Sequence, residues 1–183
     1  MIRLFVALLI PQEIRDQITK LRKSIAPDSQ DLRWEDGSKI HLTLKFIGEV
    51  KENLVEQIKN ELNFLESYPM LNCKADKFGF FFDAKKAPRI LWIGLKVDSI
   101  INSIVDELNQ RMTKYSIPAE KRKFKAHITL LRIKQNISEE FIKRFKNAEF
   151  PEINFTANEI ALMQSKLSPQ GSEYTEIKKY NLK

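Results

Sequence analysis

The chain of 183 residues contains one cysteine and two histidines, and this scarcity excludes several kinds of site. Cys73 has no second cysteine with which to form an intramolecular disulfide. With the two histidines far apart in the sequence, no spacing of ligands typical of a zinc or iron–sulfur site is present. We therefore expect that any chemistry of this chain needs no metal and no other cofactor.

The chain also lacks a long apolar run. Its first apolar segment, residues 4–10, is ended by Pro11-Gln12-Glu13 without the small-residue cleavage site that follows a signal peptide. No other segment approaches the roughly 20 apolar residues of a membrane-spanning helix. We expect a cytoplasmic protein that does not enter a membrane.

The composition, 43% hydrophobic and 30% charged residues, is that of an ordinary globular protein. Its 31 basic and 24 acidic residues give a formal net charge of +7. This positive charge favours a polyanionic partner such as nucleic acid, although solubility alone accounts for a charge of this size. Nothing in the sequence indicates an obligate protein partner, so we expect a monomer.

Both histidines open the same four-residue phrase, His41-Leu42-Thr43-Leu44 and His127-Ile128-Thr129-Leu130. In a strand, side chains alternate between faces, so each phrase places His and Thr on one face and two aliphatic residues on the other. One such phrase is most often an ordinary surface strand, but two copies that use every histidine indicate a site. Imidazole, with an unperturbed pKa of roughly 6.5, accepts or donates a proton at neutral pH. A pair suits a hydrolysis in which one group activates water and the other protonates a leaving oxygen.

The surrounding elements repeat at the same interval. Arg3 and Arg89 each precede an apolar strand, and 89 − 3 equals 127 − 41, which is 86 residues. We infer one bilobal domain over residues 1–183, duplicated internally as approximately 1–84 and 85–183. Each half has two predicted helical stripes: Ile14, Ile18, Leu21 and Ile25; Leu54, Ile58, Leu62 and Leu65; Ile101, Ile104, Leu108 and Met112; Phe141, Ile142 and Phe145.

Short strands interleaved with helices favour α/β or α+β lobes, and we expect an α+β fold of two pseudo-symmetric lobes. Each lobe would be a mostly antiparallel sheet with helices on its outer face. The phenylalanine-rich stretch 78–82 and the segments 154–163 and 174–180 would supply the closing strands. With the lobes joined near residues 83–88, the histidine strands would face each other across a cleft that forms the active site.

The paired phrases resemble the H-x-T-x motifs of the 2H phosphoesterase superfamily. Within it, the chain is similar to the bacterial and archaeal RNA 2′,3′-cyclic phosphodiesterases, also called 2′-5′ RNA ligases. The likeness spans nearly the whole chain, with HLTLKFIGEV at 41–50, PRILWIG at 88–94 and FKAHITLLR at 124–132. One difference is Ala126, where members of the family commonly have proline, but it removes no reacting group.

The resemblance implies a metal-free hydrolysis of RNA 2′,3′-cyclic phosphate ends, or of nucleoside 2′,3′-cyclic phosphates, to 2′-phosphates. Water attacks phosphorus in line with the departing 3′ oxygen, so base and acid must stand on opposite sides of the phosphate. We assign His127 as the base and His41 as the acid. Thr43 and Thr129, on the same strand faces, would donate hydrogen bonds to the phosphate oxygens.

Other residues are candidates for binding the substrate. Lys45 shares the face of His41 by alternation, whereas Arg132 falls on the face opposite His127 and helps only if the strand bends. Trp34 and Phe124 either stack on a base or pack in the core. The basic segment 121–125 either steers RNA or is a solvated loop.

Two other functions remain open. The first is a non-catalytic RNA- or nucleotide-binding protein on the same fold, although binding alone does not need two proton-transfer groups. The second is reversible 2′-5′ RNA ligation, which water at molar concentration disfavours unless the RNA ends are held together.

Overall fold

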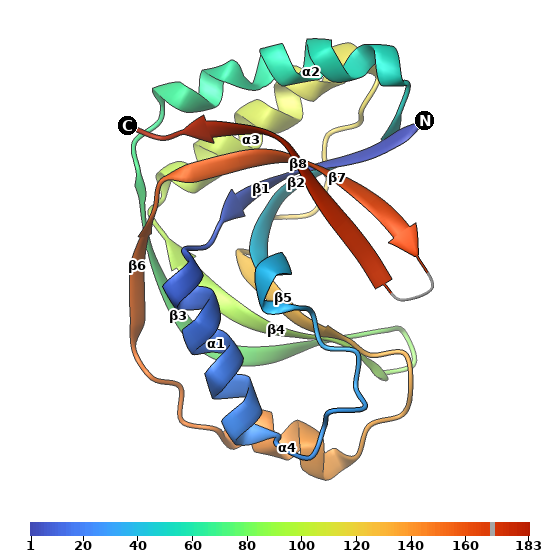
Figure 1. Cartoon of the computed structure of the whole chain (residues 1–183), viewed down its shortest axis with the longest axis vertical. Helices are drawn as coiled ribbons and strands as arrows, with labels where there is room; N and C mark the ends of the chain where they lie inside the picture. Colours follow the sequence, from blue (N-terminus) through green and yellow to red (C-terminus); the bar gives the residue numbers. More distant parts are fainter. Residues whose placement is uncertain (169–170) are drawn as a thin grey trace.

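An antiparallel sheet of eight strands runs through the computed structural model, which describes residues 1–168 and 171–183 (Figure 1). The strand order across the sheet is β6-β3-β4-β5-β2-β1-β7-β8. The strands are β1 (Ile2–Leu9), β2 (His41–Val50), β3 (Leu71–Phe82), β4 (Pro88–Val97), β5 (His127–Arg132), β6 (Ile153–Ala157), β7 (Glu159–Ser168) and β8 (Gly171–Asn181). The two histidine strands, β2 and β5, are therefore neighbours at the centre.

Helices cover both ends of this sheet, and the predicted α+β fold is confirmed. They are α1 (Gln12–Ile25), α2 (Val55–Glu61), α3 (Ile100–Met112) and α4 (Glu139–Asn147), with short 3-10 helices at Gly37–Lys39, Glu52–Leu54, Leu62–Ser67 and Thr113–Tyr115. Figure 1 shows α2 and α3 at one end of the molecule, and α1 and α4 at the other. Because α3 follows β4 in the chain yet contacts β2, it connects the two halves of the sheet.

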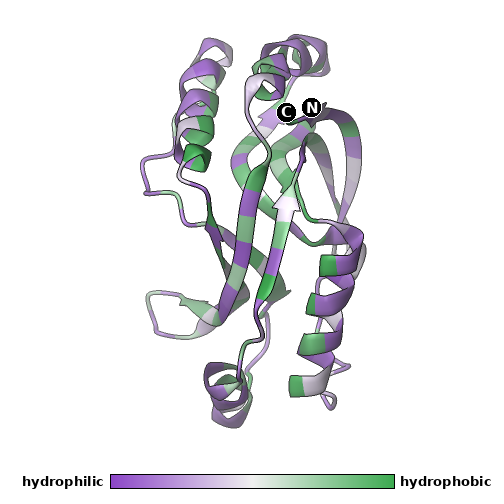
Figure 2. Ribbon diagram, turned by 90° about the vertical axis from the view of Figure 1, so that its left-hand side faces the viewer, coloured by the Kyte–Doolittle hydropathy of each residue, from purple (hydrophilic) through white to green (hydrophobic). Residues whose placement is uncertain are grey.

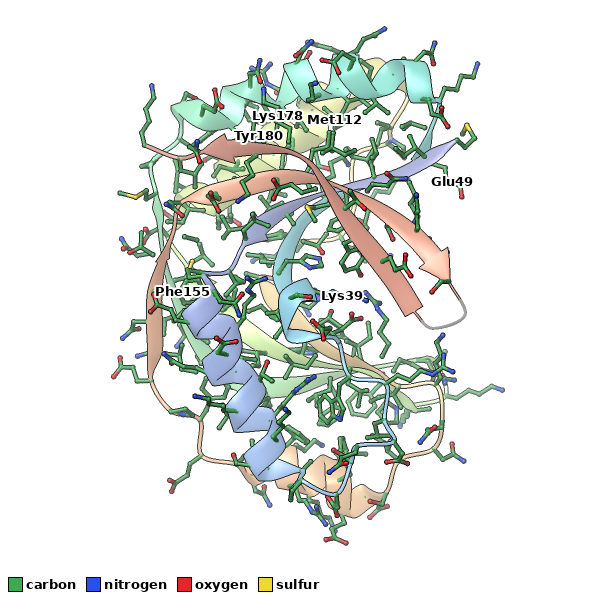
Figure 3. The ribbon with its side chains drawn as sticks, viewed as in Figure 1. Lys39, Glu49, Met112, Phe155, Lys178 and Tyr180 are labelled. Carbon is green, nitrogen blue, oxygen red and sulfur yellow. The ribbon has the colours of Figure 1, made fainter. Side chains whose placement is uncertain are left out.

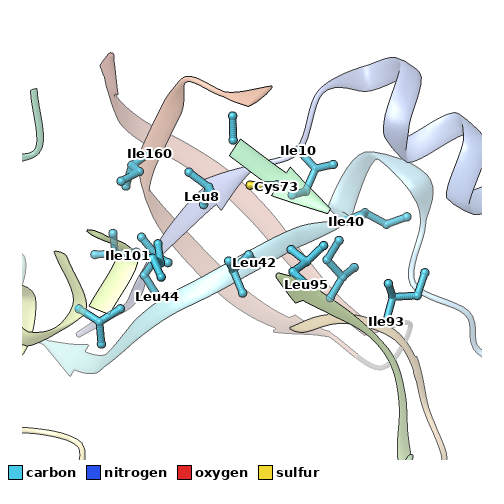
Figure 4. Packing of buried hydrophobic residues seen from close by; sticks show 14 of the residues in the cluster. Leu8, Ile10, Ile40, Leu42, Leu44, Cys73, Ile93, Leu95, Ile101 and Ile160 are labelled. Carbon is cyan, nitrogen blue, oxygen red and sulfur yellow. The ribbon is translucent and has the colours of Figure 1, made fainter. Parts of the chain in front are cut away.

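The predicted apolar stripes pack the helices onto the sheet. Figure 2 shows hydrophobic bands recurring along α1, where Ile14 and Ile18 are buried. Leu42 and Leu44 of β2 lie among the core residues in Figure 4, which also shows Ile101 of α3. The aliphatic positions of the first histidine phrase are thus held in the core, and its His and Thr face the other way.

The two halves of the sheet exchange strands along the sequence. β3, from the first predicted repeat, pairs with β4 and β6, whereas β7 and β8 pair with each other and join the sheet at β1. The expected connection between lobes near residues 83–88 is therefore wrong. Residues 83–87 form a turn between β3 and β4, in which the Asp83 carboxylate accepts hydrogen bonds from the backbone N–H groups of Lys85 and Ala87. The duplication itself, 1–84 and 85–183, stays a prediction.

Each histidine strand contains a β-bulge at the same place in its phrase, and β2 has a second irregularity later, at Ile47. Leu44 has no partner in the register of β2 with β1, and Leu130 has none in the register of β5 with β4. An extra residue shifts all later side chains to the opposite face of the sheet. Both strands accordingly bury two residues in succession, Leu44 with Lys45 and Leu130 with Leu131.

Candidate active site

The two histidines lie where the two halves of the sheet meet. β2 and β5 run antiparallel and pair at Leu42 and Ile128. In an antiparallel register around this pair, His41 stands across from Thr129, and His127 stands across from Thr43. The fold therefore brings together all four residues that the repeated phrases single out.

Both imidazole rings are anchored in the same way. The Nδ1 atom of His41 bonds to the carbonyl oxygen of Lys39 at 2.7 Å, and that of His127 bonds to the carbonyl oxygen of Lys125 at 2.7 Å. A carbonyl can only accept, so each Nδ1 carries a proton and each Nε2 is left for chemistry. In His41, Nε2 also contacts the hydroxyl of Thr43 at 3.0 Å.

Aromatic rings surround each histidine. The His41 ring lies 5.0 Å from the ring of Phe5 and 5.4 Å from that of Tyr174, measured between centroids. The His127 ring lies 5.0 Å from Phe81, which meets it edge-on. These contacts fix the ring planes from the side while the Nδ1 bonds fix their rotation.

The pKa of His41 lies below the ordinary value for histidine. Burial is the main cause, because a desolvated imidazole resists protonation, and the positive charges of Arg132 and His127 act in the same direction. The hydrogen bond to the carbonyl of Lys39 partly opposes this lowering. Arg132 and His127 therefore lie close enough to His41 for their charges to affect its pKa.

Arg132 is held on the site by a loop that precedes the first histidine. Its Nε donates to a carboxylate oxygen of Glu35 at 3.1 Å, and the backbone N–H of Glu35 donates to the carbonyl of Leu130 at 2.8 Å. Arg22 of α1 donates in turn to the carbonyl of Glu35 at 2.8 Å. Arg132 reaches this side because the bulge at Leu130 reverses the alternation of β5.

The same bulge geometry removes Lys45 from the site. The expectation that Lys45 shares the face of His41 is wrong, because the extra residue in β2 turns its side chain toward α3. Lys45 is only 5% exposed, and its ammonium donates to Asn109 Oδ1 at 2.8 Å and to the carbonyl of Pro118 at 3.0 Å. Lys45 is therefore a structural residue that ties β2 to α3 and to the segment after it.

Comparison with known proteins identifies the family. A family model described as LigT like Phosphoesterase matches residues 8–92 and 95–174, which include both histidine phrases. This protein is a LigT-like phosphoesterase. Among curated relatives of the phosphoesterase, a protein of Methanocaldococcus jannaschii is 29% identical over 182 residues, covering 97% of this chain and 99% of its own length. One of Thermotoga maritima is 26% identical over 173 residues, covering 94% and 91%. Both are named RNA 2′,3′-cyclic phosphodiesterase.

Solved structures have the same fold as this phosphoesterase. A protein of Thermus thermophilus superposes with a TM-score of 0.79 at 22% identity, covering 98% of this chain and 97% of that one. E. coli LigT complexed with 3′-AMP superposes with a TM-score of 0.77 at 24% identity, covering 99% and 98%. These likenesses establish the architecture of the LigT-like phosphoesterase.

The remaining candidates for binding RNA in this phosphoesterase differ in how far they are buried. Trp34 contacts Phe141 and Phe145, and its indole N–H donates to the carbonyl of Ser29 at 2.9 Å, so this partly buried side chain packs against the core. Phe124 is partly buried against the core. The basic segment 121–125 is largely exposed.

Sequence reasoning missed Phe46 and Glu35. Phe46 follows Lys45 and is 62% exposed, and its ring lies 6.3 Å from that of Phe5, which packs on His41. It occupies the position in β2 that Arg132 occupies in β5, since 132 − 46 is also 86. Only the bulge places Phe46 on this side, and a bulge leaves no signature in a run of apolar residues.

The described part of the chain contains neither a cluster of potential metal ligands nor a helix that could span a membrane. Among those residues, no group of three or more His, Cys, Asp or Glu side chains lies close enough together to hold a metal ion. No helix found there is long and apolar enough to cross a membrane.

Proposed function

We propose that this LigT-like phosphoesterase hydrolyses RNA 2′,3′-cyclic phosphate ends to 2′-phosphates, with two histidines as proton carriers and without a metal ion. The observation that carries the proposal is the matched pair of imidazoles on the two central strands, each with Nδ1 bonded to a carbonyl. The name of the curated relatives, RNA 2′,3′-cyclic phosphodiesterase, supports the substrate. RNA ends and nucleoside 2′,3′-cyclic phosphates both carry this group.

In the proposed reaction, a water oxygen bonds to phosphorus as the bond between phosphorus and the 3′ oxygen breaks. His127 accepts the water proton on Nε2, and His41 donates its Nε2 proton to the 3′ oxygen, which leaves a 3′-hydroxyl and a 2′-phosphate. The roles follow from exposure: the Nδ1 bond of His127 is exposed, whereas that of His41 is partly buried. Water reaches His127 more readily, and the lowered pKa of His41 makes its protonated ring the stronger acid toward the leaving oxygen.

The remaining groups stabilise charge on the phosphate. The hydroxyls of Thr43 and Thr129 donate to non-bridging oxygens, and the guanidinium of Arg132 offsets the negative charge that builds up there. Before the substrate binds, protonated His41 donates from Nε2 to the Thr43 oxygen, 3.0 Å away, and in the proposed reaction this proton passes to the 3′ oxygen instead.

An assay on an oligonucleotide with a 2′,3′-cyclic phosphate end tests this proposal. We expect release of a 2′-phosphate, identified by NMR, at the same rate with and without EDTA. Binding without turnover would mean that the protein is a non-catalytic RNA-binding protein. Activity lost in EDTA and restored only by a divalent ion would show a metal-dependent mechanism.

The same assay with a 5′-hydroxyl RNA present measures 2′-5′ ligation, and hydrolysis should dominate. The cytoplasmic location and the monomeric state expected from the sequence belong to this proposal as predictions.

A further inference from the structure

A cavity of about 460 Å³ opens beside His41. It lies between the first turn of α1, the 3-10 helix Gly37–Lys39 and the strands β7 and β8, and its walls include Arg15, Lys39, His41, Tyr174 and Lys179. His127 is not among the lining residues. The cavity therefore extends the site on one side, away from the proposed base.

Two cations in this wall form no salt bridge with a carboxylate among the described residues. Arg15 donates through Nη1 to the carbonyl of Ser38 at 2.9 Å and through Nη2 to the side chain of Gln12, while its buried Nε has no hydrogen bond in the described part of the chain. Lys39, labelled in Figure 3 at the end of the 3-10 helix Gly37–Lys39, forms no salt bridge within residues 1–168 and 171–183, although its charge acts through space on the carboxylate of Asp36. Arg15 and Lys39 are the cations that line the cavity on this side of His41.

The other end of the cavity has more negative than positive charge, with one lysine beside two carboxylates. Lys179 lies 3.4 Å from a carboxylate oxygen of Glu159 and 3.8 Å from one of Glu176. These two carboxylates line the cavity and repel an anion there. An anionic ligand is therefore directed to the end formed by Arg15 and Lys39.

The chemistry of the reaction determines which part of the substrate lies on this side. In-line attack places the ribose on the side of the leaving 3′ oxygen, opposite the attacking water. Because His41 protonates that oxygen, the ribose and the chain on its 5′ side extend past His41. The next phosphate along the RNA is one ribose away from the cyclic phosphate. Lys39 is two residues before His41 in the sequence and lines the same cavity, so it lies on the side toward which this phosphate extends.

We propose that the cavity is a second phosphate subsite, in which Lys39 and Arg15 bind the 5′-phosphate of the terminal nucleotide. This inference rests on the proposed function and refines it, because it makes a chain with an internucleotide phosphate the preferred substrate. A guanidinium and an ammonium that are not held in a salt bridge are the groups that recognise a phosphodiester.

Four substrates test the subsite: adenosine 2′,3′-cyclic phosphate, the same molecule with a 5′-phosphate, the dinucleotide ApA with a 2′,3′-cyclic phosphate end, and that dinucleotide with a neutral methylphosphonate linkage. We expect kcat/KM to be about tenfold higher for the two substrates with a 5′ anion, the usual effect of a charge-assisted hydrogen bond. The neutral linkage should remove most of this advantage. Equal values for all four would overturn the subsite, whereas no turnover of any would overturn the proposed function.

Variants locate the effect in the cavity. Lys39→Met and Arg15→Gln should each reduce the ratio of kcat/KM with and without the 5′-phosphate toward one. Lys125→Met is the matched control, because Lys125 lies 86 residues after Lys39 and anchors His127 through the same carbonyl bond. Its ratio should stay that of the unaltered protein. An equal fall in Lys125→Met would assign the preference to general electrostatic attraction and overturn the proposal.

Discussion

The two central strands are alike in backbone and, apart from the conservative pair Leu42 and Ile128, differ at two side chains of residues 41–46 and 127–132. Residues 41–46 and 127–132 have the same succession of half-buried, buried and exposed positions, the same bulge and the same Nδ1 anchor. After the bulge, however, Lys45 corresponds to Leu131, and the exposed Phe46 corresponds to Arg132. The repeated backbone supplies two equivalent imidazoles, and the unequal residues make the site asymmetric.

That asymmetry affects the chemistry. Of the two equivalent positions, only that in β5 has a cation, Arg132, so in the proposed mechanism a bound phosphate would experience a field directed toward one side of the site. The other side has the exposed, apolar ring of Phe46. If β2 and β5 had identical sequences, the site would offer the same groups to the attacking water as to the ribose of the leaving 3′ oxygen.

The largest predicted effect comes from removing the groups that the strands share. His41→Ala and His127→Ala should each lower kcat by roughly 10²- to 10⁴-fold, the usual contribution of general acid or base catalysis. The double variant should be scarcely slower than the worse single variant, because the two groups act as a unit. Thermal unfolding serves as the control for folding. A folded single variant with near-native turnover would contradict the assignment.

Arg132→Gln removes the guanidinium of β5, which has no counterpart at the equivalent position, Phe46, of β2. We expect a loss of about 10²-fold in kcat/KM, comparable to the loss of one preorganised donor. Because the charge of Arg132 lowers the pKa of His41, its removal should raise that pKa and move the optimum of the bell-shaped pH profile to higher pH.

Phe46→Gln, at the equivalent position of β2, is the matched control for Arg132. It changes no charge beside the phosphate, so the optimum should not move. A similar shift in both variants would show that Arg132 does not act on His41 by its charge.

A smaller effect is expected from the threonines. Thr43→Val and Thr129→Val should each lower the maximum of the pH profile by about tenfold, since each removes one phosphate donor. The apparent pKa values of the two limbs of the pH profile should hardly change, because both limbs report the titration of the histidine pair. A limb moved by a full unit without loss of rate would mean that a threonine controls proton transfer.

Lys45→Met should leave the rate unchanged, although the sequence places Lys45 in the site. It removes an ammonium that bonds to Asn109 and Pro118, so the free energy of unfolding should fall by ~1–3 kcal/mol. Leu131→Met is the control at the equivalent buried position and should cost less, because volume is conserved. Chemical denaturation measures both, and a rate loss in folded Lys45→Met would return Lys45 to the site.

The sequence predicts the repeated elements well because each depends on local pattern. The helical stripes and the His–Thr alternation follow directly from spacing, and they locate the four motif residues. Positions after Leu44 and Leu130 could not be predicted, because a bulge depends on the register with the neighbouring strand. Ion pairs between distant segments, such as Glu35 with Arg132, depend on the tertiary structure in the same way.

The turn at residues 83–87 shows a second limit of local reasoning. A polar stretch between repeats reads equally as a connection between lobes or as a hairpin. Pairing of β3 with β4 decides between them, and that pairing is a long-range property of the sheet.

The pairing of β2 with β5 has a consequence for motion. Among the described residues, these strands pair at Leu42 and Ile128, whereas β1 pairs with β2 from Ile2 to Leu9. We expect a ladder this short to act as a hinge line, because rotation of the halves about it would break few backbone hydrogen bonds. The distance between the two imidazoles could then vary within the limits that helix packing across the halves allows. Amide hydrogen exchange in β2 and β5 would report how often the site opens to release its product.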